Sequence, residues 1–94
     1  MTIPAPGQRF TISPSVRTRE LDDELIVLDL NQGEYYSLNS SGAQVWKALE
    51  AGQGVDWIRD EVVSRWPIPT EEGMAMVSMV LRDLLTRGLI ARAP

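Results

Sequence analysis

The chain has 94 residues, a net charge of −4, and neither cysteine nor histidine. This length allows one small domain with one core. The missing thiols exclude disulfides and cysteine nucleophiles, and the missing imidazoles remove the usual general base and zinc ligand. The acidic balance argues against binding to nucleic-acid phosphates. No apolar run is long enough to cross a membrane, and no signal-peptide pattern is present. We therefore expect a soluble cytoplasmic protein that is not an enzyme and needs no cofactor.

The N-terminal segment, residues 1–14, contains three prolines and shows no sustained hydrophobic period. These features are typical of a loosely held arm, so we expect one domain over residues 15–94. Val16–Glu20 alternates in the manner of a first strand, and an acidic turn follows it. Leu25–Leu30 is apolar on both sides of an alternating strand. This run predicts a central strand that is covered on both faces.

A hairpin turn is predicted at Asn31-Gln32-Gly33, a three-residue loop in which Gly33 takes a positive φ. The run after it is expected to be the third strand. Because the central strand is already flanked on its other side, the third strand keeps one edge free, and an open edge is a pairing template for an extended chain. Its residues are therefore the first candidates for a peptide-binding site: Glu34, Tyr35, Tyr36, Ser37 and Leu38.

Three helices are expected after the hairpin. Asn39, Ser40 and Ser41 are capping residues for a helix to about Ala51, a second helix starts near Val55 or Asp56 and stops before Pro67, and a third runs from an N-cap at Thr70 to Arg87. Helical spacing predicts a core face on the third helix made of Met74, Val77, Val80, Leu81, Leu84 and Leu85. Leu89–Ala91 is expected to be a short closing strand or a packed tail.

Three strands followed by three helices predict an α+β fold, in which a small antiparallel sheet lies against a helical bundle. The same order describes a winged helix-turn-helix, and the fold alone does not determine the function. No catalytic constellation is found, since no histidine is present to activate any serine.

Two methionines of the third helix, Met76 and Met79, fall outside its predicted core face. Methionine adapts to varied partners, so the pair either lines a pocket beside the open strand or widens a buried face. Tyr35 is either a groove wall or a cover for the rear of the sheet. Trp57 lies on the outer side of the second helix, where we expect it to pack against a neighbouring loop.

Two stretches carry a family resemblance. The run LIVLDLNQGEYYSLNSSGAQVW (25–46) and the later run VLRDLLTRGLI (80–90) together resemble the PqqD-like family. Its members are leader-peptide recognition elements of pathways that modify ribosomally made peptides (RiPPs). A chain of this length with an N-terminal arm is most similar to the freestanding recognition element of lasso-peptide biosynthesis. The resemblance implies a winged helix-turn-helix domain with a three-stranded antiparallel sheet followed by three helices, which binds no DNA.

The resemblance also implies a site. The leader of a precursor peptide would add as an antiparallel strand beside residues 34–38, in a cleft against the third helix, with a wall drawn from Met76, Met79, Val80 and Asp83. In the lasso branch the leader offers a tyrosine and a proline to an apolar pocket, and the protein delivers it to a leader peptidase, a transglutaminase-like cysteine protease. Many relatives have an acidic residue where Met76 stands, and this departure leaves open which polar contacts of the helix are kept.

Two other functions stay open. One is a DNA-binding winged helix, although the third helix carries Glu71, Glu72 and Asp83 against only Arg82 and Arg87. The other is a subunit whose open edge pairs with its own copy or with another protein.

Overall fold

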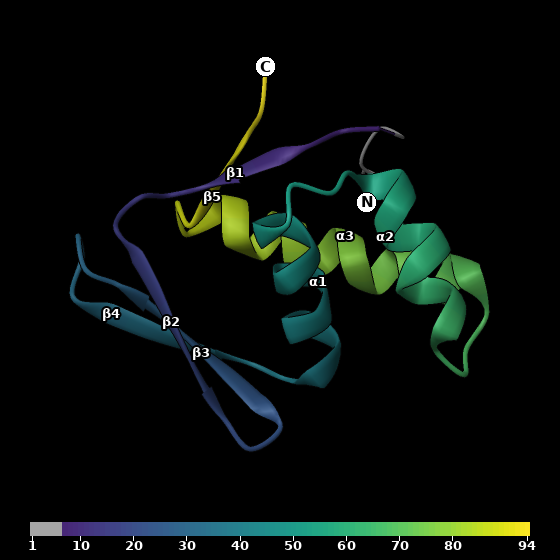
Figure 1. Cartoon of the computed structure of the whole chain (residues 1–94), viewed down its shortest axis with the longest axis horizontal. Coiled ribbons are helices and arrows are strands. Elements are labelled where there is room, and N and C mark those ends of the chain that lie inside the picture. The colour runs from purple at the N-terminus through teal and green to yellow at the C-terminus, as the bar shows by residue number, and fades with distance from the viewer. Residues whose placement is uncertain (1–6) are drawn as a thin grey trace.

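The computed structural model describes residues 7–94, which form two small sheets and three helices (Figure 1). In chain order the elements are β1 (Phe10–Ile12), β2 (Val16–Leu21), β3 (Glu24–Asp29), β4 (Glu34–Leu38), α1 (Ser40–Glu50), α2 (Val55–Glu61), the 3₁₀ turn η1 (Val63–Arg65), α3 (Thr70–Thr86) and β5 (Ile90–Arg92). The predicted α+β class and the order of three strands before three helices are confirmed. β1 and the pairing of β5 were not predicted.

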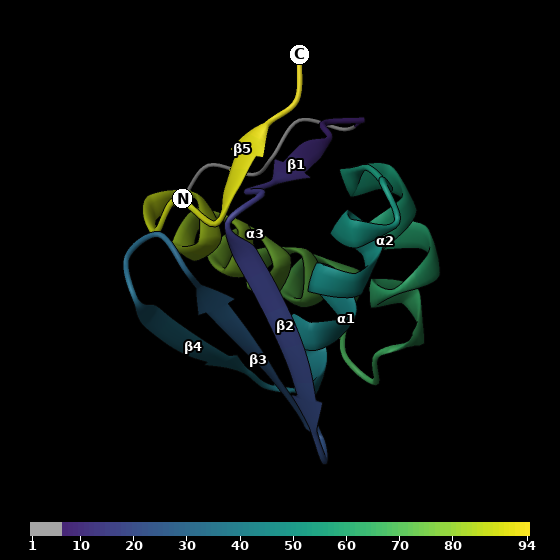
Figure 2. The same ribbon diagram turned by 60° about the vertical axis from the view of Figure 1, so that its left-hand side comes forward.

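β3 is the central strand of an antiparallel sheet with the order β2-β3-β4, as predicted. Its odd-numbered residues are buried, whereas Ile26 and Leu28 on the other face are only half-buried. The expectation that both faces are covered is therefore wrong. The reason is that all three helices lie on one side of this sheet (Figure 2), and nothing in residues 7–94 packs over the other side.

The β3–β4 connection is a four-residue loop, residues 30–33, and not the predicted three-residue one. Gly33 takes the expected positive φ of 70°, and its N–H donates to the Asp29 carbonyl at 2.8 Å. The buried Asp29 carboxylate accepts from the N–H groups of Asn31 at 3.0 Å and Gln32 at 3.3 Å. These bonds end β3 one residue earlier than expected, and they fix the point at which β4 begins.

β1 and β5 form a separate two-stranded antiparallel sheet beside the C-terminal end of α3 (Figure 1). The prediction of a loosely held arm through residue 14 is wrong for Phe10–Ile12, because Phe10 belongs to the core and Ile12 pairs with Ile90. A three-residue strand is too short to show a period in the sequence. Residues 1–6 of the predicted arm lie outside the described residues.

The core lies between the sheet, α1 and α3. Asn39 caps α1, its side-chain oxygen accepting from the Gly42 N–H at 2.9 Å. In α3, the predicted cap at Thr70 is wrong. Thr70 is the first helical residue, because the extended Pro69 before it already supplies the carbonyl that accepts from the Gly73 N–H. Three residues of the predicted core face of α3 are fully buried: Val77, Leu81 and Leu84. The other three are half-buried: Met74, Val80 and Leu85.

Candidate functional site

β4 is an edge strand, because its second side has no partner strand within the described residues. The Leu30 N–H donates to the Ser15 carbonyl at 3.0 Å. Along an antiparallel strand, successive residues direct their backbone N–H and C=O groups to opposite sides. The even-numbered residues of β3 therefore hydrogen-bond to β2, and its odd-numbered residues hydrogen-bond to β4. These odd-numbered residues are paired with the even-numbered residues of β4. Tyr36 is therefore bonded to β3, while Tyr35 and Ser37 direct their N–H and C=O groups to the open edge.

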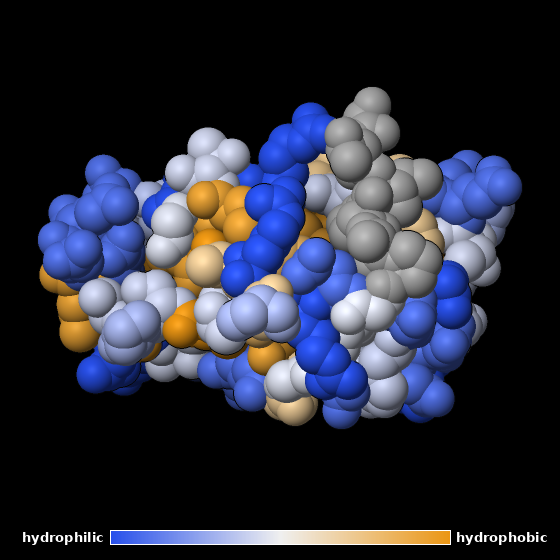
Figure 3. Space-filling model, turned by 90° about the horizontal axis from the view of Figure 1, so that it is seen from above, coloured by the Kyte–Doolittle hydropathy of each residue, from blue (hydrophilic) through white to orange (hydrophobic). Residues whose placement is uncertain are grey.

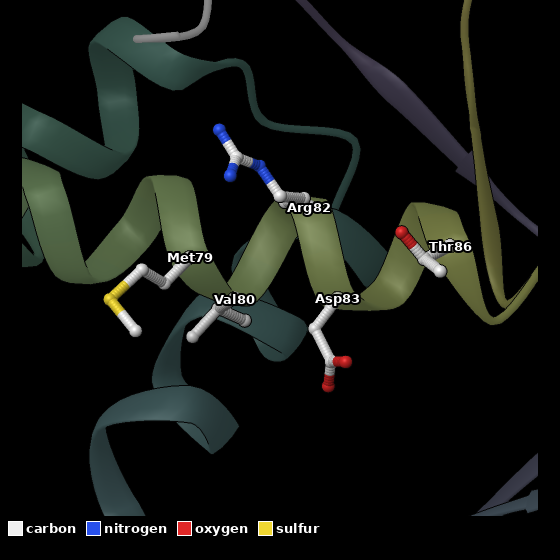
Figure 4. Close-up of a pocket in the computed structure, with 5 residues that line it drawn as sticks. All are labelled: Met79, Val80, Arg82, Asp83 and Thr86. Atoms are coloured by element: carbon white, nitrogen blue, oxygen red, sulfur yellow. The ribbon is translucent and has the colours of Figure 1, made fainter. Parts of the chain in front are cut away.

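Of the wall predicted on α3, all but Met76 line a hollow of about 520 Å³. Its lining residues are Met79, Val80, Arg82, Asp83 and Thr86. Met79, Val80 and Asp83 project to one side of the helix, and Arg82 points the other way (Figure 4). Met79 is 59% exposed and Met76 is 39% exposed. The alternative that these methionines widen a buried face is therefore wrong.

A second hollow, of about 190 Å³, adjoins the first at the start of α1. Its lining is mostly apolar and consists of Asn39, Ser41, Gly42, Trp66, Met76, Met79 and Val80. The Trp66 indole N–H donates to the Gln44 side-chain oxygen at 2.9 Å, which orients the ring. Because the two hollows share Met79 and Val80, we call them together the α3 groove.

Trp66 and the α1 residues of this groove were not among the sequence candidates. Because the second helix was expected to continue until Pro67, Trp66 was placed in its last turn. The structure ends α2 at Glu61, inserts η1, and leaves Trp66 half-buried beside α3. Two prolines follow this tryptophan, and they were the one sequence signal that the helix could not continue to it.

A side-chain network connects β4 to the end of α3. The Tyr36 hydroxyl donates to the Glu34 carboxylate, and the Arg87 guanidinium lies over the Tyr36 ring, 4.2 Å from its centroid. The Arg87 Nε donates to Asp83 Oδ1 at 3.0 Å. The hydrogen bond to Glu34 raises the pKa of Tyr36 above its ordinary value, and the nearby Arg87 cation acts in the opposite direction. Four side chains from two elements thus meet at one end of the site.

The strand candidates divide between the two faces of the sheet. Tyr36 and Leu38 pack toward the core, whereas Tyr35 is 70% exposed and Ser37 donates its hydroxyl to the Glu24 carboxylate at 2.9 Å on the other face. The Tyr35 side chain is therefore not a groove wall. Tyr35 and Ser37 offer the edge only their backbone groups.

The face of the sheet turned away from the helices, called the outer sheet face here, is unusually apolar. It combines two half-buried and three exposed apolar side chains with two arginines: Ile26, Leu28, Leu21, Leu30, Tyr35, Arg17 and Arg19. Seen from above, apolar residues also appear at the end of the molecule that holds the hairpin (Figure 3).

Within residues 7–94, no group of three or more acidic, histidine or cysteine side chains is placed to hold a metal ion. None of the helices in this part of the chain is long and apolar enough to cross a membrane. Trp57, 41% exposed, lines a hollow with Lys47, Ala48 and Ala51, so its neighbour is α1 and not the predicted loop.

Comparisons with known proteins give one matching family and two similar solved structures. A family model described as coenzyme PQQ synthesis protein D (PqqD) matches residues 24–90. The solved structure of TbiB1 in complex with the TbiA(beta) leader peptide has a TM-score of 0.79 and 28% identity, over 85% of this chain and 93% of that chain. A lasso peptide synthetase B1 complexed with the leader peptide has a TM-score of 0.80, over 88% of this chain and 98% of that chain. Its sequence is 19% identical, so this likeness shows the fold alone. No curated protein sequence matches the chain.

Proposed function

This chain belongs to the PqqD family, and we propose that it is a non-catalytic adaptor that binds the leader segment of a ribosomally made precursor peptide. The observation that carries the proposal is the open edge of β4 beside the α3 groove, whose wall exposes two methionines. The likeness to TbiB1, which was solved with a leader peptide, supports it. Without histidine or cysteine, the chain leaves cleavage of the peptide to another protein.

The leader adds to β4 as an antiparallel strand. Its main chain exchanges hydrogen bonds with Tyr35 and Ser37, the residues whose backbone groups face the edge, and these bonds supply affinity independently of peptide sequence. Alternate side chains of the added strand turn toward α3. There they meet Met76, Met79, Val80 and Asp83, which supply specificity.

The direction of the added strand follows from the pairing. An antiparallel peptide has its N-terminal part beside Leu38 and its C-terminal part beside Glu34. The smaller, apolar hollow near Trp66 lies at the Leu38 end, since its lining includes Asn39 and Ser41. A ring or apolar side chain from the N-terminal part of the leader fits there, as expected for the tyrosine and proline of a lasso leader. Downstream peptide leaves past the β3–β4 loop.

A leader peptidase is the proposed recipient, and the outer sheet face is the surface that suits it. A one-sided antiparallel sheet normally alternates apolar-in with polar-out, yet Ile26 and Leu28 point outward. Arg17 lies opposite Leu28 in register, and Arg19 lies opposite Ile26. A partner with an apolar strip flanked by carboxylates complements this face. We call β4 (Glu34–Leu38) the docking strand. Since Tyr35 belongs to both this strand and the outer sheet face, such a partner lies close to the departing peptide.

Two other functions are less well supported. A helix that enters a groove of DNA needs a basic surface to neutralise the phosphates. The first turn of α3 instead carries the acidic residues Glu71 and Glu72. Self-pairing through β4 uses the same open edge, so it competes with leader binding. Sedimentation of the protein with and without leader peptide separates the two: a dimer that persists with saturating leader contradicts the proposed use of the edge.

The test is a titration of a fluorescein-labelled leader of the lasso type, followed by anisotropy. Proline lacks the N–H that the edge offers to the peptide. Ser37→Pro is therefore expected to weaken binding about tenfold or more, because it removes this backbone hydrogen bond and disturbs the adjacent ones. Thr18→Pro is the matched control, because Thr18 directs its N–H to the opposite edge of the same sheet. Equal losses in both variants, or none in Ser37→Pro, would contradict strand addition at β4.

The transfer step is tested in the same assay with purified peptidase added. Leu28→Ser is expected to keep leader affinity and to slow leader removal, because it changes only the outer sheet face. A variant that loses leader affinity, or that leaves removal unchanged, contradicts this assignment of the face.

A further inference from the structure

Arg87 projects from a backbone that is fixed on both sides. It is the C-cap of α3: its own N–H donates to the Asp83 carbonyl at 3.0 Å, and Gly88 after it has a φ of 74°. The next residue, Leu89, is completely buried and donates its N–H to the Leu84 carbonyl at 3.0 Å. This is the hydrogen-bond pattern of a helix stop with a left-handed glycine. The direction in which the arginine leaves the helix is therefore set by the core.

The guanidinium of this arginine is held over a single target. Its Nε is bonded to the Asp83 carboxylate, and its plane lies over the Tyr36 ring, the arrangement in which a cation is attracted to an aromatic face. The hydroxyl at the far end of the same ring is bonded to Glu34. Tyr36 is thus held at its face and at its tip by side chains from two different elements.

Tyr36 occupies the centre of the docking strand. It lies between Tyr35 and Ser37, the two residues whose backbone groups face the open edge. An edge strand is bonded on one side only, and segments with few packed contacts open easily. A contact that holds Tyr36 from the α3 side therefore orders Tyr35 and Ser37, because it joins the centre of β4 to the residue that follows α3.

We propose that Arg87 is a positioning residue for peptide capture: together with Glu34 it holds Tyr36 in one orientation, so that the open edge and the α3 groove are ordered before the peptide arrives. This inference rests on the proposed function, and it adds a residue that the sequence candidates omitted. Arg87 acts here through Tyr36 and not by contact with the peptide.

A positioning role has a kinetic signature. When only a fraction of the molecules is competent to bind, the apparent affinity falls by that fraction. The loss then appears in the association rate constant, because the complex, once formed, has the same contacts as before. A residue that touches the peptide would instead change the dissociation rate constant, where most interface mutations act.

The experiment compares Arg87→Gln, Arg87→Lys and Arg65→Gln by stopped-flow mixing with the labelled leader. Arg65 is the matched control, because it forms an i,i+4 ion pair with Glu61 outside the α3 groove. Arg87→Gln is expected to lower the association rate constant about fivefold or more, with the dissociation rate constant within about twofold. Arg87→Lys should recover part of the loss, since a cation remains over the ring, and Arg65→Gln should match the unmodified protein.

The proposal would be overturned if the association rate constant of Arg87→Gln is unchanged, or if the loss of affinity comes only from a higher dissociation rate constant. A higher association rate constant would also overturn it, because Arg87 would then obstruct binding. A readout without peptide is also available. The chain has two tyrosines, so Tyr35→Phe leaves Tyr36 as the one tyrosine whose ionisation is followed by ultraviolet absorbance. In that background Arg87→Gln should raise the pKa of Tyr36, because the arginine lowers it.

An unchanged Tyr36 pKa in that titration would show that the contact does not hold the ring, and it would overturn the proposal whatever the peptide does. If instead the unmodified protein binds no leader peptide, the proposed function is wrong, and the titration still decides whether Arg87 holds Tyr36.

Discussion

Val27 and Tyr36 lie directly opposite each other at the centre of the β3–β4 ladder. Val27 is completely buried, while Tyr36 keeps its ring at the rim of the core beneath Arg87. This one pairing sets two properties of β4: which side chains turn toward the core and which backbone groups stay free. It divides a buried interior from an open groove.

Met79 and Leu81 are two positions apart on α3 but have opposite roles. Met79→Ala should change the free energy of unfolding by about 0.5 kcal/mol or less, as expected for an exposed side chain, and weaken leader binding about fivefold through lost apolar contact. Leu81 is 1% exposed, so Leu81→Ala should lower the free energy of unfolding by about 2–5 kcal/mol. Urea denaturation and anisotropy measure the two quantities. Similar stability losses in both variants would contradict the assignment of faces.

Gly73 permits the close approach of α3 to η1. A β-carbon at this position would lie 2.3 Å from Val63 Cγ1, so one of the two elements would have to move. Gly73→Ala is expected to destabilise the protein by about 1–3 kcal/mol through overpacking, although alanine favours a helix by about 1 kcal/mol over glycine. Val63→Ala makes room for the added methyl group. Denaturation of the double variant should show less destabilisation than the sum of the two single changes, and strict additivity would contradict the explanation.

The hydrogen bond between Tyr36 and Glu34 should make the free energy of unfolding depend on pH in the alkaline range. This hydrogen bond raises the folded-state pKa of Tyr36 above the ordinary value of a tyrosine. A raised pKa contributes stability that is fully present below the unfolded pKa and is lost as pH rises through the folded one. Glu34→Gln should remove part of this contribution. Thermal unfolding midpoints of the protein and the variant should therefore differ at neutral pH and converge once Tyr36 ionises in both, whereas a difference that is constant with pH would contradict the linkage.

Local patterns in the sequence were sufficient for much of the structure around the candidate site. Alternation and turn chemistry predicted β4 with the bounds that the structure shows, Glu34–Leu38, and the positive φ of Gly33. Helical spacing separated Met76 and Met79 from the buried face of α3. These predictions succeed because each depends on residues within a few positions of one another, where backbone geometry alone decides which side chains share a face.

Contacts between distant residues were decided only by the tertiary structure. Three-residue strands such as β1 and β5 leave no period in the sequence, so their pairing across the whole chain was invisible. The sequence showed that β3 is apolar on both faces, but only the packing of all the helices on one side decided which face stays open. The contact between Arg87 and Tyr36 joins segments 51 positions apart, from the difference of their numbers. No local rule specifies such a contact, because it depends on how the core orients the end of α3 against β4.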